Sequence, residues 1–173
     1  MRLLLTGVPG IGKTTVVREV LKNLRELRCA GFYTEEIRER GQRKGFKICT
    51  LDGREGVLAS IKGKGPQVGR YRVHVEEFEE MVLSLIDPEI NPADLYVIDE
   101  IGKMELLSPK FRKGVVDLLA RPANMLATIA EKGRGFVDQI KGRNDVELLE
   151  VTRENRDRLP EELAEKILQG IKL

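Results

Sequence analysis

Residues 7–14, Gly-Val-Pro-Gly-Ile-Gly-Lys-Thr, follow the pattern of a phosphate-binding loop, in which a glycine and four variable residues precede Gly-Lys-Thr. Residues 2–6 in front of the loop, Arg-Leu-Leu-Leu-Thr, are typical of a short buried strand. Behind it, apolar side chains recur at helical spacing at Val16, Val17, Val20, Leu21, Leu24 and Leu27. Strand, loop and helix in this order are the context in which the motif binds phosphate, so we expect a nucleotide site. The glycine order Gly-x-x-Gly-x-Gly reverses the dinucleotide fingerprint and argues against an NAD site.

Each residue type in the loop has a physical task. Glycine permits the tight turns and the close backbone approach through which N–H groups at a helix start bind an anion. Lys13 is expected to reach the β- and γ-phosphates, and the Thr14 hydroxyl is expected to bind Mg²⁺. The predicted nucleotide-binding residues of the loop are Gly7, Val8, Pro9, Gly10, Ile11, Gly12, Lys13, Thr14 and Thr15.

A second candidate element follows the continuous apolar run at residues 95–98, which is typical of a parallel strand buried on both faces. The run ends in Asp99 and Glu100, and an acid at the end of such a strand is the usual second holder of the metal ion in phosphate-loop proteins. Neighbouring strand residues point to opposite faces. We therefore expect Asp99 to face the metal with Thr14, and Glu100 to orient an attacking water, with both carboxylates in the nucleotide site.

The 173 residues suit one α/β domain spanning residues 1–173. Strand and helix patterns alternate along the chain, which predicts a mostly parallel sheet with helices on both faces. Residues 30–61 differ, because short alternating segments are separated by turn residues at 41–44 and 52–53, and we expect an antiparallel hairpin insert at one edge. Further strands are expected at 70–75, 125–130 and 146–151, and helices at 76–86, at 111–119 and from about 160.

Composition narrows the classes of function. Thirty Lys and Arg against 28 Asp and Glu give a formal charge of +2, which is typical of a solvated surface and makes nucleic acid an unlikely partner. The chain shows no leader and no apolar run long enough to cross a bilayer, so we expect a cytoplasmic protein without a membrane partner. Cys29 and Cys49 lack metal-ligand spacing and are expected to be reduced thiols, and His74 is expected to be structural.

The loop GVPGIGKTT together with residues 96–106, Tyr-Val-Ile-Asp-Glu-Ile-Gly-Lys-Met-Glu-Leu, resembles the nucleoside-triphosphatase family known from thermophiles, with vertebrate relatives called cancer-related NTPases. Residues 69–73 and 151–156 also resemble family segments, so the resemblance covers essentially the whole chain. It implies a RecA-like sheet and hydrolysis of ATP, GTP, CTP and UTP to the diphosphate and phosphate with Mg²⁺. It also implies that Glu100 is the catalytic glutamate.

Two further segments have open roles. Residues 131–135 follow a predicted parallel strand, at the rim where ligands bind, so Lys132 or Arg134 is a candidate cation for the γ-phosphate or part of a solvated basic loop. Residues 152–156 follow the last strand and either approach the base and ribose or form a polar connection.

The leading hypothesis is an Mg²⁺-dependent nucleoside triphosphatase with Lys13 and Glu100 as catalytic residues. The first alternative is a small-molecule or nucleotide kinase whose insert holds the acceptor. The second alternative is a nucleotide-switched RNA-binding module that uses the basic residues within 38–44. The sequence leaves open the preferred base, the physiological substrate and the oligomeric state.

Overall fold

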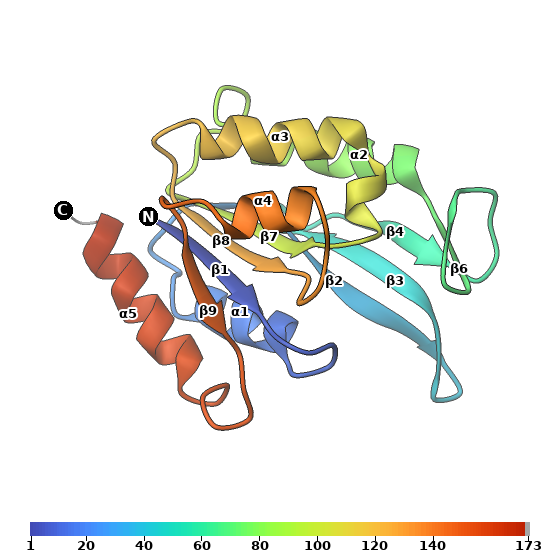
Figure 1. The fold of residues 1–173 in the computed structure, drawn as a ribbon, viewed down its shortest axis with the longest axis horizontal. Helices are drawn as coiled ribbons and strands as arrows, with labels where there is room; N and C mark the ends of the chain where they lie inside the picture. Colours follow the sequence, from blue (N-terminus) through green and yellow to red (C-terminus); the bar gives the residue numbers. More distant parts are fainter. Residues whose placement is uncertain (172–173) are drawn as a thin grey trace.

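The computed structural model describes residues 1–171, whose nine strands form one sheet (Figure 1). The strands are β1 (Arg2–Thr6), β2 (Cys29–Glu39), β3 (Gln42–Thr50), β4 (Glu55–Ser60), β5 (Gln67–Val68), β6 (Tyr71–Val73), β7 (Leu95–Ile101), β8 (Met125–Ile129) and β9 (Glu147–Glu150). The helices are α1 (Lys13–Lys22), α2 (Val75–Val82), α3 (Pro109–Leu119), α4 (Phe136–Lys141) and α5 (Leu159–Ile171), with 3₁₀ turns η1 (Leu83–Ile86) and η2 (Glu105–Leu107).

The strand order across the sheet is β5-β6-β4-β3-β2-β7-β8-β1-β9, and the five strands from β2 to β9 are joined by parallel pairs. Strand β8 lies between β1, which leads into the phosphate-binding loop, and β7, which carries the two acids. Ala127 of β8 is paired with Leu4 on one side and Ile98 on the other. The carboxyl ends of β1, β7 and β8 therefore meet at one edge, which is where ligands bind in such sheets.

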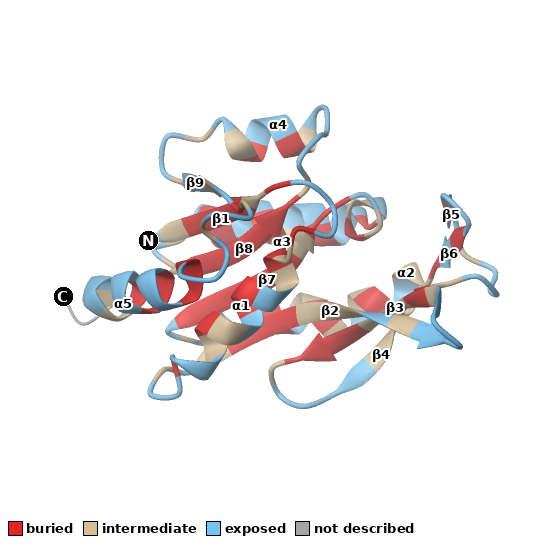
Figure 2. Cartoon of the chain, turned by 90° about the horizontal axis from the view of Figure 1, so that it is seen from below, coloured by how far each residue is buried: buried red, intermediate tan, exposed pale blue. Residues whose placement is uncertain are grey.

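Helices cover both faces of the sheet, as predicted (Figures 1 and 2). Strand side chains alternate between two buried clusters, so Leu4 packs with α2, α3 and α4 whereas Leu3 and Leu5 pack with α1 and α5. Phe32, Phe78 and Phe111 join the sheet to α2 and α3 through edge-on ring contacts with centroids 5.0–6.1 Å apart. These two cores fix the loop between β1 and α1 against the end of β7.

The antiparallel part of the sheet has different limits from the expected insert at 30–61. Residues Cys29–Phe32 of β2 pair in parallel with β7, and the antiparallel ladder with β3 starts only at Phe32. A Cβ atom on Gly31 would lie 1.9 Å from the Val97 carbonyl oxygen, so only glycine allows this close pairing. At the other end, β5 and β6 extend the antiparallel ladder to Val73. We call residues 33–73, which form the antiparallel end of the sheet, the arm.

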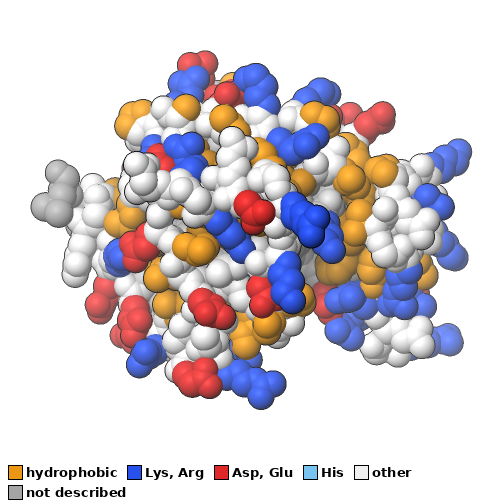
Figure 3. All heavy atoms as spheres, viewed as in Figure 1, with side chains coloured by type: hydrophobic (Ala, Val, Ile, Leu, Met, Phe, Trp, Pro, Cys, Tyr) orange, Lys and Arg blue, Asp and Glu red, His pale blue; other side chains and the backbone are white. Residues whose placement is uncertain are grey.

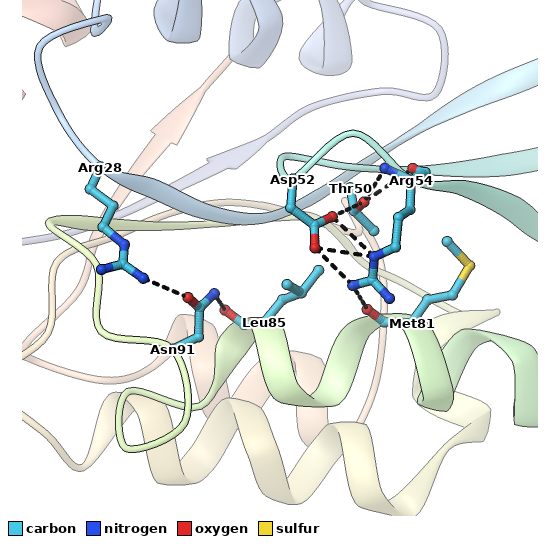
Figure 4. Close-up of polar contacts among 7 residues, drawn as sticks. All are labelled: Arg28, Thr50, Asp52, Arg54, Met81, Leu85 and Asn91. Atoms are coloured by element: carbon cyan, nitrogen blue, oxygen red, sulfur yellow. Dashed lines mark hydrogen bonds and ion pairs between the residues drawn. The ribbon is translucent and has the colours of Figure 1, made fainter.

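The turn between β3 and β4 lies at residues 50–54, where the Asp-Gly pair predicted it (Figure 4). Thr50 Oγ1 donates to Asp52 Oδ1 at 2.5 Å and accepts the Arg54 backbone N–H at 2.9 Å. The Arg54 guanidinium then donates to the Met81 carbonyl oxygen at 3.3 Å. These bonds attach the base of the arm to α2.

Three helices differ from the expected ones. Helix α1 ends at Lys22, and Leu24 and Leu27 belong to a tight turn that is hydrogen-bonded back to Leu21 and Leu24. Leu24 is nevertheless buried against the same core, which is why the helical spacing continued past the helix. Helix α2 ends at Val82 and continues as the 3₁₀ turn η1 through residue 86. Helix α4 was not predicted, because its six residues are too few to show a period next to two glycines.

The structure also places the two cysteines and the histidine considered in the sequence. Cys29 and Cys49 are free thiols, and burial followed by the charge of Asp94 raises the pKa of Cys29 to about 11. His74 contacts Ser60 Oγ at 3.0 Å and Glu77 at 3.4 Å at the start of α2. No helix within residues 1–171 is both long and apolar enough to span a membrane.

Candidate active site

The loop between β1 and α1 has the backbone that its glycines predicted. Gly7, Gly10 and Gly12 have φ values of 148°, 79° and 111°, which side chains other than glycine rarely allow. A Cβ atom on Gly7 would also lie 2.7 Å from the Val151 carbonyl oxygen, because the loop packs against the end of β9. Helix α1 begins directly after Gly12, so its first N–H groups face the loop, where a phosphate binds.

Lys13 is held inside the site although it is a cation. Its side chain is largely buried, and Nζ donates to the Gly7 carbonyl oxygen at 2.9 Å. The carboxylate atom Glu100 Oε2 lies 4.0 Å from the same Nζ atom. The ammonium group therefore lies between the phosphate-binding loop and the end of β7, where it can bind the terminal phosphates.

Asp99 is the most buried acid of the site, with 1% of its surface exposed. Its Oδ2 atom accepts the Thr14 hydroxyl at 2.7 Å, and its Oδ1 atom accepts the Thr128 hydroxyl at 2.5 Å. Burial raises the pKa of Asp99, and the two hydroxyl bonds oppose that effect. The two hydroxyls thus hold the carboxylate in place. They do not fully offset the free-energy cost of burying its charge.

The oxygens of Thr14 and Asp99 fit a magnesium ion. Mg²⁺ prefers hard oxygen ligands and usually takes only one or two protein groups, with phosphate oxygens and water completing its shell. Within residues 1–171 no group of three or more His, Cys, Asp or Glu side chains is arranged as an all-protein metal cage. A divalent cation beside Asp99 would also offset the cost of burying that carboxylate.

Glu100 lines the same cavity as Asp99 and turns toward Lys13. The prediction that the two acids point to opposite faces is therefore only partly right, because the regular pairing of β7 with β8 is interrupted between Ile98 and Ile101. Burial raises the pKa of Glu100, while Lys13 lowers it and Asp99 raises it. A carboxylate with a raised pKa beside the Lys13 ammonium group is suited to accept a proton.

Two further buried residues lie near these acids and were not predicted as site residues. Glu105, in η2, is 5% exposed, and its Oε2 atom and Glu100 Oε1 both lie within 3.1 Å of the point where Gly102 would carry a Cβ atom. Burial, followed by the charge of Glu100, raises the pKa of Glu105 to about 8. Thr128 is fully buried in β8. Its signal in the sequence was a single polar residue in an apolar strand, whereas Glu105 had no local signal.

These residues line one open cleft of about 1120 Å³ that runs from the loop onto the arm. At one end lie Gly7, Lys13, Thr14 and Asp99, and at the other lie side chains of β2, β3, β4 and β5. A smaller hollow of about 220 Å³ between η1 and α3 contains none of the phosphate-loop residues. The large cleft is therefore the candidate active site.

The two open segments lie on opposite sides of this site. Lys132 lines the cleft, whereas Arg134 of the same loop does not. Arg156 follows β9, and its Nη1 atom donates to the Ile11 carbonyl oxygen at 3.1 Å. Residues 152–156 thus adjoin the outer side of the phosphate loop.

A sequence profile of the NTPase family matches residues 2–164 of the chain. The chain belongs to this family. It is 44% identical over 164 residues to nucleoside-triphosphatase THEP1 of Thermotoga sp. strain RQ2, covering 94% of this chain and 93% of that protein. It is 47% identical over 170 residues to the protein of the same name from Thermofilum pendens, covering 95% and 93%.

Two solved structures share the fold of this NTPase family member. The crystal structure of THEP1 from the hyperthermophile Aquifex aeolicus superposes with a TM-score of 0.87 at 35% identity, covering 96% of this chain and 99% of the other. The solution structure of a human cancer-related nucleoside triphosphatase superposes with a TM-score of 0.82 at 35% identity, covering 97% of each. The resemblance noted on residues 7–15 and 96–106 is confirmed, and so is the α/β fold.

Proposed function

We propose that the protein is an Mg²⁺-dependent hydrolase that converts nucleoside triphosphates, including ATP, GTP, CTP and UTP, to the diphosphate and phosphate. The observation that carries this proposal is the position of Glu100, whose carboxylate lies 4.0 Å from the phosphate-binding ammonium group of Lys13. A water on the far side of a γ-phosphate held by Lys13 would lie within reach of that carboxylate. Family membership and the names of the relatives support the same reaction.

In this proposal the chain supplies positioning and charge rather than a covalent nucleophile. The backbone N–H groups of residues 7–14 and the ammonium of Lys13 bind the phosphates and stabilise the charge that develops during transfer. Glu100 orients the water and accepts its proton. Lys13 Nζ donates to the Gly7 carbonyl oxygen in this structure, and a phosphate oxygen would take the place of that carbonyl when the substrate binds.

Thr14 and Asp99 would hold the magnesium ion, because their oxygens are adjacent and hard. When bound, Mg²⁺ would supply Lewis-acid neutralisation of the phosphate charge. Thr128 keeps Asp99 in place by donating its hydroxyl to Oδ1. Free Cys29 and Cys49 fit a reducing compartment, and we place the activity in the cytoplasm.

The kinase alternative retains one supporting observation, which is that the cleft continues past Glu100 onto the arm. One experiment separates the two functions: release of inorganic phosphate is measured from purified protein with Mg²⁺ and each NTP, without an acceptor and with EDTA as the metal-removal control. The proposal predicts steady multiple turnover with Mg²⁺ and background release with EDTA. Release that appears only after a sugar or nucleoside is added would contradict hydrolysis and favour the kinase.

A further inference from the structure

At the arm end of the cleft, Arg43 lines the wall, and it shares one tyrosine with Arg70, which lies directly behind it. Arg43 Nε and Arg70 Nε both donate to the Tyr71 hydroxyl, at 2.8 Å and 3.2 Å. Arg70 Nη2 also donates to the Arg43 carbonyl oxygen, and the two guanidinium carbons lie 5.7 Å and 5.3 Å from the Tyr71 ring centroid. Two like charges are therefore held close together by a side chain that is itself buried.

The positive charge at this place is only partly neutralised. Glu36 is paired with Arg43 at 2.9 Å, but it also pairs with Arg38 at 2.6 Å. Among residues 1–171, no carboxylate forms an ion pair with Arg70. One carboxylate thus serves two guanidinium groups, and Arg70 adds a third positive charge without an ion pair of its own. Arginine side chains fixed in this way match phosphate oxygens geometrically.

The surrounding surface has the same sign. Lysines and arginines gather at the end of the molecule where the arm projects (Figure 3). The arm, residues 33–73, contains ten Lys and Arg against five Asp and Glu. The formal charge of the whole chain is only +2, so basic side chains are concentrated on the arm. Such a concentration attracts anionic ligands.

This positive site opens into the same cleft that contains the phosphate-binding loop. Arg43 lines the cleft, and so does Phe46, whose ring lies 5.1 Å from the Arg43 guanidinium carbon. Leu58, Val68 and Met104 add apolar wall between Arg43 and Glu100. A ligand bound there would place its phosphate against the arginines and its flat or apolar part against these side chains. It would lie on the arm side of a nucleotide held by the phosphate-binding loop.

We propose that the arm end of the cleft is a second binding site that takes the phosphate group of a nucleotide, through Arg43 and Arg70, with the nucleotide's base or sugar against Phe46 and its apolar neighbours. The nucleotide is either free or part of a single strand, because the recognised chemistry is the same. The proposal deepens the proposed function, since it fills the same cleft, but binding at the second site does not require hydrolysis.

The test is a binding experiment with the first site filled. The protein is saturated with Mg²⁺ and a non-hydrolysable NTP analogue, and AMP, GMP, CMP and UMP are titrated by calorimetry, with a ten-nucleotide single-stranded RNA in a separate arm. We expect at least one probe to bind the parent. The double variant Arg43→Ala/Arg70→Ala should lose about 10-fold or more of that affinity, the scale for losing a charged hydrogen bond. Binding by monophosphates identifies a free nucleotide, and binding by the RNA alone identifies a strand.

Lys44→Ala is the matched control, because Lys44 carries the same charge on the same strand and does not line the cleft. It should keep the probe affinity within about 2-fold, since a charge that does not line the cleft contributes little to binding there. Arg43→Lys keeps the charge and removes the planar guanidinium group. Its probe affinity should lie between that of the parent and that of the double variant. Circular dichroism and analogue affinity establish that the variants are folded.

Three results would overturn the second site: no probe binds the parent, the double variant binds as the parent does, or the double variant loses analogue and probe together. The last result would place the arginines at the first nucleotide. The variant Glu100→Gln is measured in parallel and separates this proposal from the proposed function. Probe binding at the second site is measured in it without turnover, so the result does not depend on hydrolysis.

Discussion

Thr14 and Asp99 are joined across the site by a hydrogen bond of 2.7 Å from the threonine hydroxyl to Asp99 Oδ2. The two residues are 85 positions apart, yet β1 and β7 bring them together with only β8 between. The phosphate-binding loop and the acidic end of β7 are therefore one site, and the predictions below test its parts separately.

Lys13→Ala should weaken NTP·Mg²⁺ binding by about 10-fold or more and abolish turnover, because it removes the buried ammonium group beside Gly7 and Glu100. Equilibrium binding of a labelled NTP measures the first effect and phosphate release the second. Lys22→Ala, at the exposed end of α1, is the matched control. Parent-like affinity in Lys13→Ala would show that the loop does not hold the nucleotide as described.

Thr14→Ala and Asp99→Asn should each raise the Mg²⁺ concentration needed for half-maximal turnover, because the first removes the hydroxyl oxygen proposed to hold the metal and the second removes the negative charge of the neighbouring carboxylate. The measurement is a magnesium titration at fixed, saturating NTP. Asp138→Asn, on the surface of α4, serves as the control for a lost aspartate charge. Magnesium titrations that coincide with the parent in both variants would show that the metal is held elsewhere.

The stability of the protein should fall between about pH 5 and pH 8 in part because of Glu105. The pKa of this group is raised from 4.5 to about 8 in the folded state. In that interval the folded chain holds a proton that the unfolded chain has lost, so the free energy of unfolding decreases as the pH rises. Glu105→Gln stays neutral throughout and should show a shallower decrease.

Urea unfolding at pH 5, 6, 7 and 8 measures this slope. Asp99 and Glu100 also have raised pKa values and act in the same direction, but they remain in both proteins. Glu80→Gln, on the exposed side of α2, controls for a lost glutamate. Identical pH slopes in the parent and Glu105→Gln would mean that Glu105 is charged in the folded protein.

Lys132→Ala should slow turnover by about 10-fold or more, because Lys132 lines the cleft at the carboxyl end of β8, where a cation can stabilise the transferred phosphate. Arg134→Ala removes a cation from the same loop that does not line the cleft, and its rate should stay near that of the parent. Single-turnover hydrolysis compares the two variants. The reverse ranking would assign the catalytic cation to Arg134.

The sequence predicted the parts of the site that depend on local patterns. The loop at residues 7–14 has its own motif, and Asp99 and Glu100 were recognisable because a buried parallel strand ends there. Glu105 was missed because its burial beside Glu100 arises from η2, a short turn with no period in the sequence. Thr128 was missed because its partner, Asp99, lies on a neighbouring strand.

The arm was recognised as antiparallel, but its limits were not. Strand β2 changes from a parallel partner of β7 to an antiparallel partner of β3 within one strand, at Phe32. Alternation of side chains is the same in both kinds of pairing, so the pattern cannot mark that change. The gathering of Arg43 and Arg70 on Tyr71 likewise depends on the pairing of β3, β4 and β6.

Glu100 is proposed to act on the attacking water rather than on the bound nucleotide, and the variant Glu100→Gln separates these two roles. One preparation is used for both NTP·Mg²⁺ affinity and single-turnover hydrolysis, with Glu80→Gln as the control. We predict affinity within a few fold of the parent and a rate lower by about 10² or more, the usual scale for losing a general base. Hydrolysis at the parent rate in Glu100→Gln would contradict the account.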